Sequence, residues 1–190
     1  MLLVAGLTAS VLIQTMGDLQ ETAMQTSKET IRDISTGLKV THVSGYNNGS
    51  KITQLAIFIM PIAASQEIDL TYGYITLSDS INKIILNYSS NSFSSSVSNG
   101  LFNTLNASNL TSTTYGIMVV RDVDKSCSLG RPVINDGDLV VLLINTTKCF
   151  SGLNTRTDVI GMVYPENGIG GVVAFTTPSF YSKTIIDLQP

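Results

Sequence analysis

The first 37 residues constrain this 190-residue chain more than any other segment. They open with the apolar run MLLVAGLTASVLIQTM and continue into the polar and charged run GDLQETAMQTSKETIRDIST. Because they contain no proline, one continuous helix is allowed, and Gly37 is placed to end it as a glycine with positive φ. At 1.5 Å per residue this helix is about 50 Å long, which exceeds the width of a small domain. The remaining residues therefore cannot bury its far end.

The apolar residues of this predicted helix fall on one stripe. Their spacings of three, four or eight place them on a single face, interrupted only by Ser27. Such near-heptad spacing is typical of helices that pack side by side. The residues of the stripe are Leu12, Met16, Leu19, Ala23, Ile31 and Ile34, and Leu38 continues it.

The apolar start has two interpretations. A bilayer span needs roughly 20 apolar residues, and residues 1–13 fall short of that length. The same residues lack the basic region and the small-residue cleavage site of a secretory signal. The smooth passage into the stripe favours a hydrophobic helix whose upstream part lies outside this sequence. The alternative is a core helix or a leftover signal peptide.

After Gly37 the helical period gives way to short alternating or fully apolar runs, which predict eight or nine strands. Residues 52–60 are apolar at nearly every position, so we expect a central strand buried on both faces and ended by Pro61. Residues 89–114 are rich in serine and asparagine, and we expect a long exposed excursion there. No helical pattern recurs. The predicted class is α+β: one long N-terminal α-helix (1–37), then an all-β sandwich or barrel domain (38–190).

The composition argues against nucleic-acid binding and against catalysis. Charged residues make up 13% of the chain and the net charge is −3, so no basic patch is available for phosphates. No nucleophile elbow, phosphate loop, dinucleotide fingerprint or zinc-protease motif is present. The single histidine, His42, lies among apolar neighbours on a predicted strand, where a structural role is expected.

Two features point to the cell exterior. Five asparagines stand in Asn-x-Ser/Thr sequences, which accept N-linked glycans on exported chains. These asparagines are Asn48, Asn87, Asn106, Asn109 and Asn145. The second feature is the pair Cys127 and Cys149, for which we expect a disulfide in an oxidising compartment. The alternative is two unpaired buried thiols.

A calcium-like pattern occurs after residue 121. Asp122 and Asp124 alternate as oxygen ligands do at the start of a calcium loop, but Cys127 then occupies the position of the tight-turn glycine. Asp136 and Asp138 offer further carboxylates nearby in the sequence. These four residues form a candidate site for a divalent cation such as calcium, and ordinary turn carboxylates are the alternative.

Several long segments in a fixed order resemble archaeal flagellins (archaellins). They include LVAGLTASVLIQTMGDLQETAMQTSKET, STGLKVTHVSGY, ITQLAIFIMPIAAS, IDLTYGYITLSD, YGIMVVRDVDKSCS, PVINDGDLVVLLINTTKCF and GVVAFTTPSFYSKTIIDLQ. The resemblance implies a helix similar to that of type IV pilins and an immunoglobulin-like outer domain. It also implies a precursor with a short basic leader, removed by a prepilin-type peptidase ahead of a longer apolar run in which Met1 falls.

The function implied by the resemblance is that of a structural subunit. Copies of the chain, and a second archaellin where one exists, would pack through their helices into an extracellular filament for swimming and surface adhesion. The implied partners are the membrane before assembly and the archaellum motor and platform at the filament base. Two alternatives stay open: a static pilin-like adhesive filament, and a membrane-anchored monomeric module that binds a surface ligand.

Overall fold

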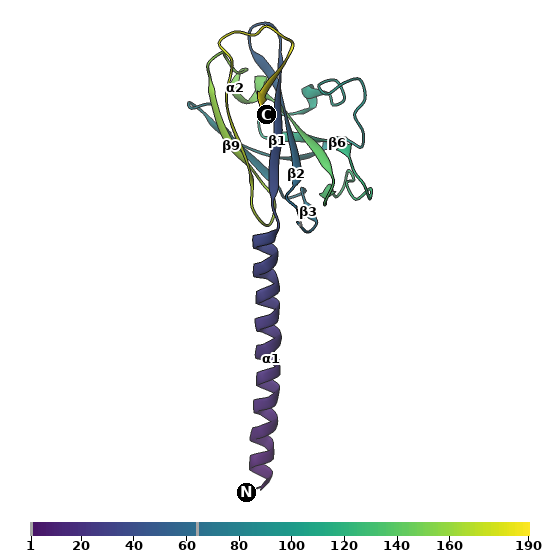
Figure 1. Ribbon diagram of the computed structural model, residues 1–190, viewed down its shortest axis with the longest axis vertical. Helices are drawn as coiled ribbons and strands as arrows, with labels where there is room; N and C mark the ends of the chain where they lie inside the picture. Colours follow the sequence, from purple (N-terminus) through teal and green to yellow (C-terminus); the bar gives the residue numbers. More distant parts are fainter. Residues whose placement is uncertain (1, 64) are drawn as a thin grey trace.

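One long helix projects from a β-domain, so the molecule has the outline of a stalk and a head (Figure 1). The helix, α1, runs from Leu2 to Ser35. The computed structural model describes residues 2–63 and 65–190, and within α1 it describes the side chains of residues 6, 8–31 and 35. Every side chain from Thr8 to Ile31 is exposed. The β-domain therefore leaves the described surface of α1 uncovered, as expected from the length of the helix.

The β-domain is built on one nine-stranded sheet in the order β10-β9-β4-β5-β6-β8-β2-β1-β11, with a separate small sheet β3-β7. All neighbours in the large sheet are antiparallel except β5 and β6. This arrangement confirms the predicted α+β class. The strands are β1 (Leu38–Asn47), β2 (Ile52–Pro61), β3 (Ile68–Asp69), β4 (Tyr74–Ser78), β5 (Lys83–Ser94), β6 (Thr114–Arg121), β7 (Val133–Ile134), β8 (Leu139–Asn145), β9 (Asp158–Tyr164), β10 (Gly171–Thr176) and β11 (Ile185–Gln189).

The large sheet curls until its two edge strands approach each other. Gln189 at the end of β11 accepts a hydrogen bond from the Ala174 amide at 2.9 Å and donates one to the Val172 carbonyl at 3.3 Å, both on β10. These bonds satisfy backbone groups that an open sheet edge would leave unpaired. The β-domain is therefore close to a closed barrel.

The strands β2, β6 and β8 are buried on both faces. Their inward residues join the main core, which lies inside the curled sheet. Their outward residues lie under the segment 95–113, whose Phe102, Leu105 and Leu110 form a second apolar cluster with Met118 and Leu143. The prediction of a doubly buried strand at residues 52–60 is thus confirmed. The exposed excursion expected after residue 88 is wrong in part, because its few large apolar residues cover the sheet.

Two short helical turns follow Gly37, contrary to the sequence-based expectation. The turn η1 (Ala107–Asn109) lies within the covering segment, and the helix α2 (Thr146–Phe150) follows β8 directly. The Asn145 side chain caps α2 by accepting a bond from the Lys148 amide at 3.2 Å, and Ser151 ends it in the left-handed region. Segments this short carry no helical period, so the sequence pattern could not reveal them.

A tight joint connects α1 to the β-domain. The carbonyl of Thr36 accepts a bond from the Ile169 amide, and the carbonyl of Gly37 accepts one from the Ile62 amide, both at 2.9 Å. A Cβ atom on Gly37 would lie 3.0 Å from the Ile62 side chain and 3.1 Å from Ile169. Gly37 does not have the positive φ expected from the sequence. A larger residue there would have to displace these neighbours, because two loops close around the chain.

The disulfide expected between Cys127 and Cys149 is not formed, and both thiols are free. The Cys127 amide bonds to Asp122, whose carboxylate lies within 4.8 Å of that of Asp138, just before β8. Cys149 lies in α2, just after β8. A seven-residue strand is about 23 Å long, whereas a disulfide needs Cα atoms within about 7 Å. The two cysteines therefore lie near opposite ends of β8, too far apart for a disulfide.

We expect two unpaired, slowly reacting thiols in the purified chain. Burial raises the pKa of Cys127 to about 12 and that of Cys149 to about 11, so little reactive thiolate forms at pH 8. Without reductant, mass spectrometry after alkylation should show two labels on the denatured chain and much slower labelling of the folded chain. A reductant should leave the thermal midpoint unchanged. An unlabelled denatured chain that gains labels only after reduction would contradict the structure.

Candidate assembly surface and surface sites

The stripe of α1 lies in full contact with solvent. Leu12, Met16, Leu19 and Ile31 are between 61% and 70% exposed, and Ala23 is also exposed. The side chain of Ile34, the last stripe residue, lies outside the described residues. Side chains of this size each contribute about 1.5–3 kcal/mol when they are fully buried. A surface with several of them exposed in a row is therefore typical of a protein contact.

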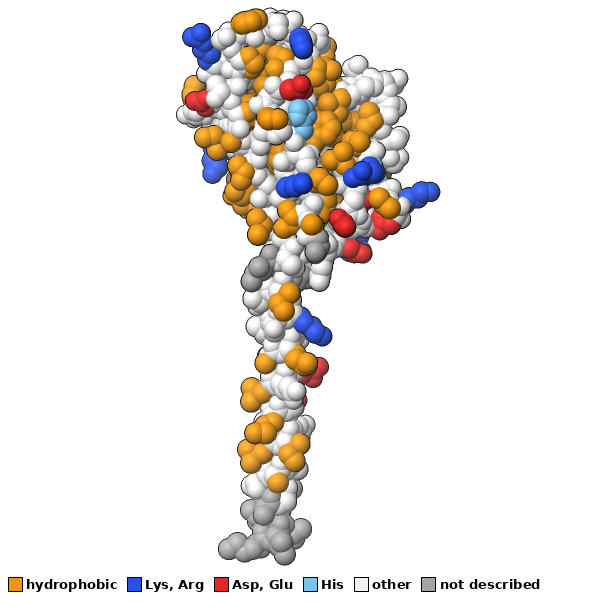
Figure 2. All heavy atoms as spheres, in the orientation of Figure 1, with side chains coloured by type: hydrophobic (Ala, Val, Ile, Leu, Met, Phe, Trp, Pro, Cys, Tyr) orange, Lys and Arg blue, Asp and Glu red, His pale blue; other side chains and the backbone are white. Residues whose placement is uncertain are grey.

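Apolar residues surround the helix beyond the stripe. Val11 and Ile13 flank Leu12 and point to other sides of the helix, and both are exposed, as is Met24. Figure 2 shows apolar side chains along the described length of the stalk, with few charged groups between them. No charged residue occurs before Asp18. The N-terminal half of α1 thus suits an apolar environment on more than one side.

The threonines of α1 satisfy their own hydroxyl groups. Thr15, Thr22, Thr26 and Thr30 each donate a hydrogen bond to the carbonyl four residues earlier, at 2.8–3.0 Å. A hydroxyl bonded in this way needs no water when the surface around it becomes dry. These polar residues therefore do not oppose burial of the helix.

None of the helices in the described part of the chain combines the length and apolar character needed to cross a membrane.

Four of the five predicted glycan acceptors are exposed. Asn48 lies in the turn between β1 and β2, Asn87 lies on β5, and Asn106 and Asn109 lie at the two ends of η1. The structure therefore presents these four side chains at the surface.

Asn145 is buried, with 8% of its surface exposed. Its side-chain oxygen caps α2, and its side-chain amide, the group that a glycan would occupy, donates to the carbonyl of Ala107 at 2.8 Å. The fold uses this asparagine to join α2 to the covering segment. The surface position that the sequence predicted for Asn145 is therefore wrong.

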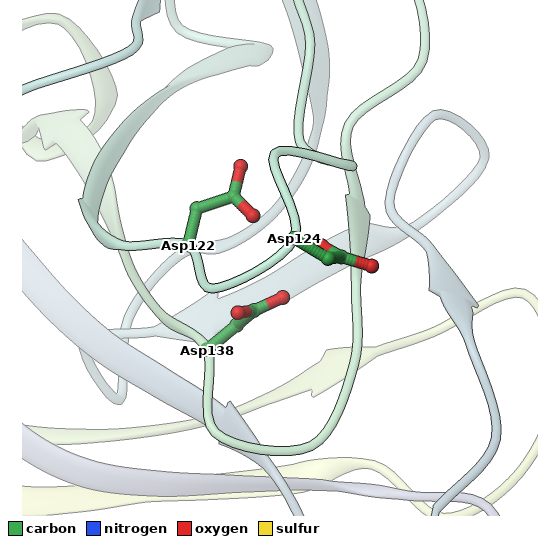
Figure 3. A group of neighbouring side chains, drawn as sticks. All are labelled: Asp122, Asp124 and Asp138. Carbon is green, nitrogen blue, oxygen red and sulfur yellow. The ribbon is translucent and has the colours of Figure 1, made fainter.

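Three of the four predicted cation ligands come together. Carboxylate oxygens of Asp122, Asp124 and Asp138 lie within 4.8 Å of one another, where the loop after β6 meets the turn before β8 (Figure 3). Asp136 is exposed at the tip of that turn and is not a member of the group. The turn residue Gly137 has a φ of 91°, and the backbone there directs Asp138 inwards.

Backbone amides already bind these carboxylates. The buried Asp138 accepts bonds from the amides of Val123 and Asn135, both at 2.9 Å. Asp122 accepts from the amides of Ser126 and Cys127, at 3.2 and 3.1 Å. Amide donors stabilise negative charge, so these bonds hold the loop in shape and offset part of the repulsion among the three acids.

Asp124 is the exposed member of the group. It accepts bonds from the Ser126 amide at 3.0 Å and from the Asn135 side chain at 2.6 Å. Hydrogen bonding to Ser126 is the largest cause that holds its pKa below the usual value. The carboxylate is therefore charged at neutral pH and available to a cation.

The single histidine, His42, lies on β1, and its contacts are structural. Its Nε2 is 2.8 Å from the Ser44 hydroxyl and 3.2 Å from an Asp187 oxygen on β11, and its ring meets Phe58 edge to face. These contacts join neighbouring strands.

The full chain matches proteins of one family. A sequence model described as archaeal-type flagellin matches residues 1–175. Flagellin B2 of Methanocaldococcus jannaschii is 42% identical over 193 residues, which cover 100% of this chain and 89% of that protein. Flagellin B5 of Pyrococcus abyssi is 38% identical over 206 residues, which cover 100% of this chain and 93% of that protein.

Solved structures extend the likeness to the fold. The crystal structure of archaeal flagellin FlaB1 from Methanocaldococcus jannaschii has a TM-score of 0.73 and 34% identity, covering 81% of this chain and 97% of that one. The archaeal flagellum of Methanospirillum hungatei has a TM-score of 0.67 at 12% identity, covering 100% of this chain and 92% of that one, and thus shares the fold. With its long exposed helix and near-barrel domain, the chain belongs to the archaeal-type flagellin family.

Proposed function

We propose that this flagellin polymerises through α1, with its β-domain forming the outer wall of the filament. As a flagellin, the chain is a structural subunit of the extracellular archaellum filament that serves swimming motility. The observation that supports the route of assembly is the helix itself, whose described side chains from Thr8 to Ile31 are all exposed. Other copies of the same helix are the partner that matches this surface in length and spacing.

Close packing of copies is feasible along the N-terminal part of α1. Gly6, Ala9 and Ser10 are small, and small residues allow helix backbones to approach one another. A side-chain carbon on Gly6 would meet no atom within 4 Å in the single chain, so the space beside it is open for a neighbour. Contacts that join different surfaces of successive copies do not close on themselves, and they yield an open helical polymer.

We also propose further partners for the chain. Before assembly, the apolar half of α1 lies in the membrane, and afterwards the filament base contacts the motor and platform that rotate it. A second flagellin shares the filament where one is expressed. The chain's role is structural and not catalytic. A static adhesive filament is the competing function, and loss of swimming on gene deletion separates the two, because an adhesive filament leaves swimming intact.

Leu19→Asp tests assembly through α1. A carboxylate in the stripe would be buried without a partner, so we expect at least a tenfold loss of filaments in cells that assemble this chain. The β-domain should stay folded, because Leu19 contacts none of it. Gln25→Asp, on the opposite side of the helix, is the matched control and should retain filaments. Electron microscopy and pelleting measure the effect, and normal filaments from Leu19→Asp would refute the proposal.

Glycopeptide mass spectrometry of filaments tests the surface sequons. We propose that Asn48, Asn87, Asn106 and Asn109 carry glycans and that Asn145 does not, because its side-chain amide is buried and bonded. Replacing Asn145 by Gln should lower the thermal midpoint by removing the α2 cap, whereas Asn109→Gln should not. A glycan on Asn145 would show that modification precedes folding of this region.

We further propose that Asp122, Asp124 and Asp138 bind one calcium ion that supports the loop between β6 and β8. Their mutual distance of 4.8 Å or less supports this, since a divalent cation would offset the remaining repulsion. Millimolar calcium should raise the thermal midpoint, and a chelator should reverse the rise. Asp124→Asn should abolish the response, while Asp136→Asn should preserve it. The same midpoint with calcium and with chelator would mean that amide bonds alone hold the loop.

A further inference from the structure

Apart from β1 and β11, the outward surface of the curled sheet has two unlike halves. On one half, the segment 95–113 covers β2, β6 and β8 with the buried side chains of Phe102, Leu105 and Leu110. The other half consists of β10, β9, β4 and β5, and β9 is labelled on the left of the head in Figure 1. In the part of the chain that the structure describes, no segment forms a comparable apolar cluster over this second half.

Strand register places large apolar side chains together on that second half. Burial alternates along each strand, so Tyr74 on β4, Ile85 on β5 and Ile160 on β9 point outwards. Thr76 stands between Ile85 and Met162 in one cross-strand row, and Val172 of β10 ends that row. We call this surface the uncovered face: Tyr74, Ile85, Ile160, Met162, Tyr164 and Val172.

The uncovered face has the character of a protein contact. Ile160 is 63% exposed and Val172 is 52% exposed, and Tyr74 stacks on Tyr164 with ring centroids 4.7 Å apart. Its charged residues, Lys83 and Asp158, lie at the end of the strands away from Tyr74: Lys83 is in the cross-strand row of Ile160, and Asp158 is two residues before Ile160 on β9. Aromatic residues are enriched, and charged residues depleted, at the centre of protein interfaces.

The turn that joins β9 to β10, two strands of the uncovered face, reaches the base of α1. Beyond Tyr164, the chain turns at Gly168 and Ile169 before β10 begins. The exposed Ile169 bonds to Thr36 and Leu38 on either side of the joint, at 2.9 and 2.8 Å. The turn therefore brings one exposed apolar side chain to the joint, and the exposed Glu166 and Asn167 lie between it and Tyr164.

We propose that the uncovered face is covered in the filament by the β-domain of a second copy of this chain. This inference rests on the proposed assembly through α1, since packing the helices side by side brings the attached β-domains together. The joint at Gly37 fixes the position of the β-domain relative to α1, because its backbone bonds tie α1 to two loops of the domain. The contact is heterologous: the face meets a different surface of its neighbour, as an open polymer requires.

A glycan on Asn87 is the competing occupant. Asn87 stands directly opposite Tyr74, so a sugar attached there would lie against the Tyr74–Tyr164 pair. The observations favour a protein chain because Ile160 and Val172 are aliphatic, lie on the two strands farther from Asn87, and need an apolar cover.

The test compares two exposed isoleucines. Ile160→Lys places a charge within the proposed contact, and Ile81→Lys places the same charge in the β4–β5 turn, outside the face. In cells that assemble this chain, Ile160→Lys should lower the filament mass that survives shear by about tenfold, the effect of one lost contact. Ile81→Lys should match the unchanged chain. Equal filament mass for all three would overturn the inference.

A second measurement does not depend on filament yield. A photo-crosslinking amino acid at position 172 should join two copies in assembled filaments, at a site that peptide mapping places on a neighbouring β-domain. Crosslinks only to a glycan, or none, would overturn the inference and leave the helix proposal intact. Failure of assembly through α1 would be recognised separately, by normal filaments from Leu19→Asp.

Discussion

The structure depends on one constraint: the apolar surface of α1 has no cover within its own chain. A helix about 50 Å long extends away from a domain that its fold has already closed, so folding alone leaves Leu12, Met16 and Leu19 in water. Hydroxyls bonded to the helix backbone and the absence of charge before Asp18 both lower the cost of drying this surface. The apolar surface of α1 is thus buried only on assembly, as expected for a filament subunit.

The β-domain is built to stand beside copies of itself without joining them edge to edge. Gln189 ties β11 to β10, so the edges of the large sheet bond to each other. The segment 95–113 covers one outward half of the sheet. Contact with neighbouring copies is therefore left to the side chains of the uncovered face. The joint at Gly37 sets the direction of that face relative to α1.

Periodicity in the sequence was sufficient for the main architecture. The stripe predicted α1, and the continuous apolar run at residues 52–60 predicted a strand buried on both faces. What covers that strand could not be predicted, since Phe102, Leu105 and Leu110 are scattered among serines and asparagines without a period. Distances between residues that are far apart in the sequence could not be predicted either. The presence of two cysteines suggested a bridge between Cys127 and Cys149, but the fold places them near opposite ends of β8.

Copies of α1 are proposed to cover one another, and a reconstruction of the native filament at side-chain resolution would show this contact directly. We expect α1 helices packed side by side at the filament centre, with Leu12, Met16 and Leu19 in contact with neighbouring helices and the β-domains outside. A filament in which the β-domains form the central contacts, while α1 lies at the surface with its stripe in solvent, would contradict it.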